Sequence, residues 1–138
     1  MMVVVAMVVM AGCAGDVTQA PADDVVLRVV LGGEVVADWT LADLESGVDF
    51  VSMTIDGDDQ SGPRLLDVLD ASGVDLWETA EVFGMGEGRV VEVALDITYA
   101  QVNDGWIFDV TKQGTLKLAT ADLPREQWVR DVGEINIP

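Results

Sequence analysis

The sequence has no histidine and only one cysteine among its 138 residues. A single cysteine cannot form an internal disulfide, and a chain without histidine cannot build Ser/His/Asp or Cys/His catalytic groups. Basic residues are also scarce: seven lysines and arginines stand against 25 acidic residues, which gives a net charge of −18. Such a surface repels the phosphates of nucleic acids. We therefore expect no nucleic-acid partner, and the charge favours cations or a basic partner.

The longest apolar run stands at the start of the chain. Met2 to Met10 contains no charged residue, but it is too short to cross a bilayer, which takes about 20 apolar residues. Its length is typical of a signal-peptide core. The following Met10-Ala11-Gly12-Cys13 resembles the lipobox of bacterial lipoproteins, where small residues precede a cysteine that is joined to a diacylglycerol. The resemblance implies a signal peptide over residues 1–12, lipidation of Cys13 and an extracytoplasmic, membrane-anchored protein in the cell envelope. The alternative is an incidental cysteine in a signal peptide that is cleaved elsewhere.

Residues 13–24 are small and polar and contain a proline, which is typical of a tether. Half of the whole chain is apolar, too much for a disordered acidic tail. We therefore predict one folded domain over residues 25–138.

Short alternating runs of apolar and polar residues predict that this domain is built mainly of short strands. The expected strands are Val25–Leu31, Glu34–Val36, Val51–Asp56, Glu78–Phe83, Val91–Ile97, Trp106–Val110, Thr115–Ala119 and Trp128–Ile137. Helical segments are expected at Thr40–Leu44, which has a capping box, at Pro63–Ser72, which ends before a glycine, and as one turn at Leu123–Gln127. Short strands with a few small helices predict the α+β class with mainly antiparallel pairing.

The order of these elements resembles the oxidoreductase molybdopterin-binding domain, which has the sulfite-oxidase-like fold. The segments that carry the resemblance are GGEVVADWTLADLES, SGPRLLDVLDASGV and the C-terminal DGWIFDVTKQGTLKLATADLPREQWVRDVGEINI with its W-V-R-D-V-x-x-I strand. It covers roughly residues 25–138 and implies a compact form of that domain.

The resemblance also implies a cysteine ligand for molybdenum at the end of the strand before the Pro63 helix. That strand ends in Ile55-Asp56-Gly57-Asp58-Asp59, and no thiol follows Cys13. A pterin phosphate or an oxyanion substrate requires basic side chains. Arg64 and Arg89 are therefore candidate ligand-binding residues. We expect no cofactor here, because the thiolate ligand is missing. Molybdopterin is implied by the family resemblance only.

Three further patterns are candidate sites. Trp106 stands at a hairpin start, where it contacts either a ligand or the core. Asp56, Asp58 and Asp59 form either a loose cation site or a solvated acidic loop that caps the next helix. The glycine-rich Gly84–Gly88 is interpreted as a hairpin turn rather than a phosphate loop, because a strand follows it.

These observations favour a binding or accessory module of an envelope redox system, which carries an oxidoreductase-like domain without its metal ligand. One alternative is an active molybdopterin-dependent oxidoreductase that uses Asp56, Asp58 or Ser61 as the metal ligand. Another is a structural, calcium-responsive surface module.

Overall fold

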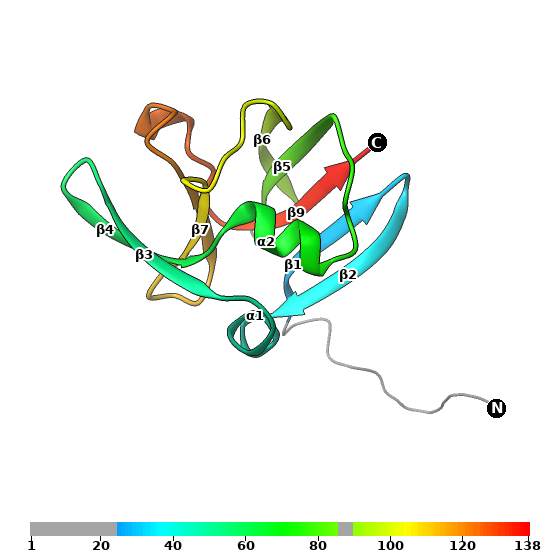
Figure 1. Ribbon diagram of the computed structural model, residues 1–138, viewed down its shortest axis with the longest axis horizontal. Helices are drawn as coiled ribbons and strands as arrows, with labels where there is room; N and C mark the ends of the chain where they lie inside the picture. Colours follow the sequence, from blue (N-terminus) through cyan, green and yellow to red (C-terminus); the bar gives the residue numbers. More distant parts are fainter. Residues whose placement is uncertain (1–24, 86–89) are drawn as a thin grey trace.

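The computed structural model describes residues 25–85 and 90–138 (Figure 1). Their elements, in chain order, are β1 Val25–Leu31, β2 Glu34–Thr40, α1 Leu41–Gly47, β3 Phe50–Ile55, β4 Asp58–Pro63, α2 Leu65–Ala71, β5 Thr79–Met85, β6 Val91–Thr98, β7 Ile107–Val110, β8 Leu116–Ala119, a 3₁₀ turn at Arg125–Gln127, and β9 Val132–Ile137. No helix in these two ranges is long and apolar enough to cross a bilayer.

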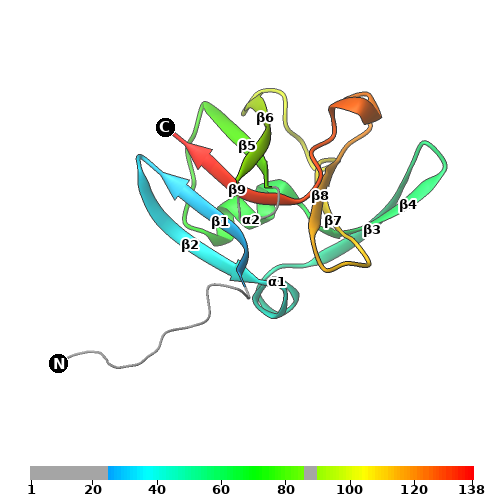
Figure 2. The same cartoon turned by 180° about the vertical axis from the view of Figure 1, so that it is seen from behind.

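The larger sheet has the strand order β2-β1-β9-β5-β6, and β8 joins it beside β9 and carries β7. Its pairs are antiparallel except for β1 and β9, which run parallel with Arg28 opposite Glu134. Seen from behind, β9 lies between β1 and β5 (Figure 2). The last strand of the chain is therefore central to the sheet.

The predicted α+β, sulfite-oxidase-like fold was wrong. The described residues are mostly β, and the sheet is mixed. The helical patterns at Thr40 and Pro63 do form helices, but α1 and α2 have only seven residues each. Two turns of helix bury too little apolar surface to form a layer of their own, so the strands define the architecture.

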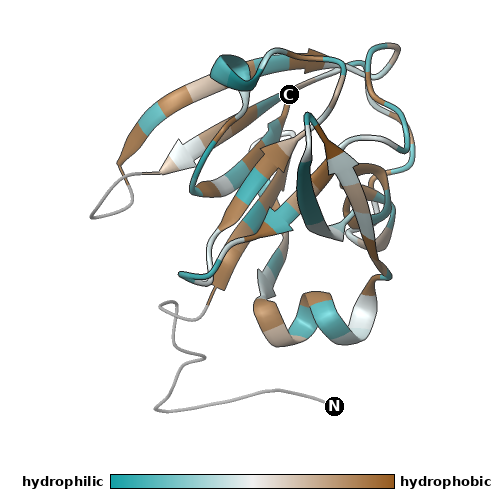
Figure 3. Cartoon of the chain, turned by 90° about the vertical axis from the view of Figure 1, so that its left-hand side faces the viewer, coloured by the Kyte–Doolittle hydropathy of each residue, from teal (hydrophilic) through white to brown (hydrophobic). Residues whose placement is uncertain are grey.

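Apolar residues alternate with polar ones along the strands (Figure 3), and the apolar positions meet α2 on one face of the large sheet. Leu65, Val68 and Leu69 of α2 are buried in this core. The sheet contributes Leu27, Val29, Val82 and Ile135, all fully buried. This periodicity agrees with the sequence prediction for β1, β5 and α2, while α1 begins with the predicted capping box: Asp43 N–H donates to Thr40 Oγ1 at 3.0 Å.

A hairpin of β3 and β4 forms a second, two-stranded sheet. Its turn is Asp56-Gly57, with φ of 53° and 85°, as a two-residue hairpin turn requires. The interpretation of Asp56–Ser61 as an acidic loop that caps a helix was therefore wrong, because Asp58 begins a strand. This hairpin packs against β7, and Ile55 joins Trp128 in a small second core.

Candidate functional site

Two predicted site residues, Cys13 and Arg89, lie outside the described residues, and so does most of the Gly84–Gly88 turn. Trp106 lies in the main core and is fully buried. Its indole N–H donates to Asp122 Oδ2 at 3.0 Å, and the Asn103 side chain donates to the same oxygen at 2.9 Å. Trp106 thus takes the core position that sequence analysis gave as its alternative, away from any ligand in solution.

Arg64 precedes α2 and pairs with Asp67 of the same helix at 3.3 Å. Its Nε atom is buried without a hydrogen-bond partner, while its backbone bridges to Ile107. Arg64 therefore connects α2 to β7, and it lines neither of the two hollows described below.

The three aspartates of the predicted cation site point to different partners. Asp58 accepts from Arg125 Nη2 at 2.6 Å, and Asp56 lies 3.9 Å from Arg125 Nε. Asp59 instead accepts from the Thr54 hydroxyl at 2.8 Å. Within residues 25–85 and 90–138, no group of three or more acidic, histidine or cysteine side chains could hold a metal ion. The hairpin turn is therefore neutralised by an arginine and does not gather oxygen ligands.

Molybdopterin does not fit the residues at the position that the family resemblance implies. The end of β3 passes into the tight Asp56-Gly57 turn, and Arg125 occupies the carboxylates that would replace the missing thiolate. Arg125 is further held by the Ile55 carbonyl at 3.3 Å and by the Trp128 ring, 4.8 Å from its guanidinium carbon. Arg125 thus holds the hairpin turn against the Trp128 ring, and these contacts occupy the guanidinium that a pterin phosphate would need.

A different arrangement was missed by sequence reasoning: a hollow of about 680 Å³ beside the β7–β8 hairpin. Three of the seven basic residues of the chain line it, together with three aspartates and the polar side chains of the β7–β8 turn. We call it the hairpin hollow, and its charged residues are Lys112, Lys117, Arg130, Asp59, Asp109 and Asp131.

Long-range packing creates the hairpin hollow. Lys112 stands in the turn between β7 and β8, while Arg130 precedes β9, which pairs with β8 at Leu116 and Val132. Gly84 lets the segment before β9 approach β5, because a Cβ at this position would lie 2.7 Å from the Arg130 carbonyl oxygen. The two cations therefore reach one hollow only when β9 has joined the sheet.

The charges in the hairpin hollow are only partly paired. Lys117 Nζ lies 3.7 Å from Asp109 Oδ2 and 5.7 Å from the centroid of the Trp128 ring. The other oxygen of Asp109 accepts from the Ser61 N–H at 2.8 Å. Lys112 and Arg130 have no ion-pair partner among the residues that the structure describes. The hollow thus offers two cationic side chains without an ion-pair partner among the described residues. One feature of the sequence could have indicated this hollow: four of the seven basic residues fall between positions 112 and 130.

A scan of protein-family models finds none that matches the chain, and a search of curated proteins finds no significant match.

Proposed function

We propose that the protein is a binding module that takes a small polar ligand with an anionic group, a carboxylate or a phosphate ester, in the hairpin hollow. The observation that carries this proposal is the gathering of Lys112, Lys117 and Arg130 in one hollow of about 680 Å³ on a chain of net charge −18. This volume is in the range of small-molecule sites.

The charge distribution supports an anionic ligand at this position. Lys117 already pairs with Asp109, so Lys112 and Arg130 are the groups that would meet the anion. An arginine binds a carboxylate or phosphate oxygen pair in a fork geometry, while a lysine adds a point charge. Asp131 and Asp59 in the same wall favour a ligand that also carries hydrogen-bond donors. The acidic surface elsewhere repels anions, which confines binding to the hollow.

The proposal includes the expectation that lipid on Cys13 anchors the module to a membrane on the extracytoplasmic side. The lipobox-like Met10-Ala11-Gly12-Cys13 supports it. Two or more acyl chains give stable anchoring, and one alone binds only reversibly. We also propose, on the family resemblance alone, that the module is an accessory to an envelope redox protein. In that role it binds the ligand and catalyses no reaction.

Calorimetric titration with citrate, inorganic phosphate and glucose 6-phosphate tests the proposal. We expect saturable binding of at least one anion, weakened about tenfold or more in a Lys112→Gln/Arg130→Gln double variant, because both charge-assisted hydrogen bonds are lost. The matched control is Arg28→Gln, which removes an exposed arginine from β1 and should leave binding unchanged. Failure of every anion to bind, or equal binding by the double variant, would contradict the proposal.

A further inference from the structure

The outer edge of β6 is open in the described part of the chain, because β6 ends the sheet and pairs only with β5. The Tyr99 N–H donates to the Glu78 carbonyl at 2.9 Å. Antiparallel pairing alternates, so Ile97 and Leu95 also bond to β5, whereas the N–H groups of residues 98, 96 and 94 point outward. The Thr98 N–H follows this alternation, because it donates to the Gln101 side-chain oxygen at 3.2 Å.

Proteins usually protect a sheet edge with lysine, proline or bulges. β6 contains neither lysine nor proline over its eight residues, and its one register irregularity is an extra residue, Glu92, between Val91 and Val93. Two of its apolar side chains are about half exposed, Val91 at 47% and Val93 at 51%. The opposite edge strand, β2, is interrupted by two register shifts against β1. From Val93 to Thr98, β6 is therefore a regular edge without lysine, proline or a bulge.

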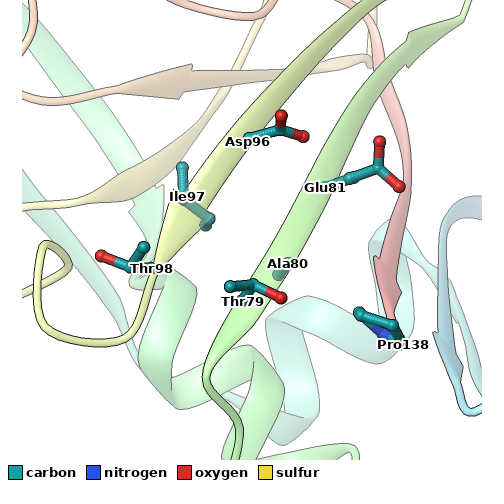
Figure 4. Close-up of a pocket in the computed structure, with 7 residues that line it drawn as sticks. All are labelled: Thr79, Ala80, Glu81, Asp96, Ile97, Thr98 and Pro138. Carbon is teal, nitrogen blue, oxygen red and sulfur yellow. The ribbon is translucent and has the colours of Figure 1, made fainter.

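The two faces of β6 differ in chemistry. Asp96 lies on the solvent face and stands directly opposite Glu81 of β5. The carboxylates of Asp96 and Glu81 line a hollow of about 400 Å³ (Figure 4). Like charges opposite each other destabilise a sheet, and no lysine or arginine in the described ranges pairs with either. The other face carries Val93, whereas the register shift places Val91 opposite Met85, on the face of Glu81.

We infer that the β6 edge binds an extended segment of a partner protein in which basic residues alternate with apolar ones. Such a segment adds a strand to the sheet through the outward N–H and C=O groups. Its basic side chains meet Asp96 and Glu81 on one face, and its apolar side chains cover Val93 on the other. A second copy of this chain fits poorly, because antiparallel self-pairing brings Glu92 close to Asp96 of the other copy, and each copy carries a net charge of −18. This inference does not depend on the hairpin hollow.

Fluorescence anisotropy with a labelled peptide of four Lys-Val repeats tests this inference. The control peptide has the same composition with the lysines and valines in two blocks. We expect the alternating peptide to bind about tenfold more tightly, because only it places charge and apolar side chains on opposite faces of an added strand. Equal binding of the two peptides would mean attraction by charge alone and would overturn the inference.

Two variants locate the binding site. Ala94→Pro removes an outward N–H without removing a bond to β5, and edge strands accept proline at such positions. It should weaken the alternating peptide about tenfold, while the control Ala94→Val leaves binding unchanged. Asp96→Lys relieves the repulsion with Glu81, so it should fold at least as well as the unaltered protein and also lose the peptide. Circular dichroism establishes that each variant is folded. If Ala94→Pro does not fold, Asp96→Lys decides.

The inference would be overturned by unchanged peptide binding in folded Ala94→Pro or in Asp96→Lys. Sedimentation analysis of the protein tests whether a second copy of the chain occupies the β6 edge instead. A dimer of the chain that Ala94→Pro abolishes would make a second copy, rather than a basic partner, the occupant of the edge.

Discussion

Replacement of Gly62 by alanine should disrupt the contact between the β3–β4 hairpin and the large sheet. Gly62 lies in β4 and is buried. A Cβ built there would collide with the carbonyl oxygen of Phe108 in β7, with the carbonyl carbon at 2.8 Å and Asp109 Cα at 3.4 Å. Backbone atoms cannot move aside as a side chain can, so β4 and β7 must separate. The hydrogen bond from the Ser61 N–H to Asp109, 2.8 Å long, would then be lost.

The expected cost follows from these two effects. Overpacking costs about 1–3 kcal/mol, and loss of a hydrogen bond to a charged group costs about 1.5–3 kcal/mol. Together they lower the free energy of unfolding by about 2.5–6 kcal/mol, a large part of the total for a domain of this size. The Tm should fall by about 10–20 °C.

The measurement is urea and thermal unfolding beside a matched control, Gly33→Ala. Gly33 has a φ of 87° and nothing within 4 Å of an added Cβ, so alanine there meets only backbone strain of about 1–2 kcal/mol. If Gly62→Ala proves no more destabilising than Gly33→Ala, the close packing of β4 on β7 is refuted. Gly62→Ala should also weaken anion binding, because Asp59 of β4 and Asp109 of β7 both line the hairpin hollow and separation of the two strands would change its shape.

Four further predictions concern charge, calcium, molybdenum and membrane anchoring. The Tm should rise with added NaCl, because the Debye length falls from about 10 Å at 0.1 M to about 3 Å at 1 M and screens the repulsion among acidic groups; a flat or falling Tm would mean that the charges are already neutralised in pairs. Calcium at matched ionic strength should add little to this shift, and a large specific shift would restore a cation site at Asp56, Asp58 and Asp59. Protein made in a molybdopterin-competent host should contain no stoichiometric molybdenum by elemental analysis, and one metal per chain that disappears in Asp56→Ala would contradict this. Native protein should partition into detergent and Cys13→Ala should release it; an unmodified N-terminus by intact mass of membrane-extracted protein would count against lipidation.

Local patterns predicted much of the secondary structure. The alternation in β3 and in β6 indicated strands, and the apolar stripe from Leu65 to Leu69 indicated α2. The fold class was harder, because helix length decides it and the patterns at α1 and α2 extend over two turns only. Asp56-Gly57 is a strong hairpin signal. Sequence analysis instead interpreted the aspartates around it as either a loose cation site or an acidic loop that caps the next helix, and neither interpretation includes the strand that begins at Asp58.

The candidate site could not be found from local sequence. Lys112 and Arg130 share a hollow because β9 pairs with β8, and no pattern within either segment specifies that contact. Trp106 is a second residue whose position local sequence could not decide. Its place at a hairpin start was compatible with a ligand contact or with the core, and the structure places its ring in the core, with its N–H donating to Asp122 sixteen residues later. Tertiary packing decides both outcomes, and neither is encoded within a few residues.

The parallel pair of β1 and β9 has a consequence for how the chain folds. Arg28 and Glu134 are more than a hundred residues apart, yet their strands are neighbours, and β9 separates β1 from β5. Contacts this distant close a long loop and slow folding. During synthesis β1 and β2 form a hairpin early, but they have no sheet to join until the last strand has left the ribosome. The large sheet would therefore stay incomplete at least until β9 has been synthesised, and β1 and β5 remain unconnected until then.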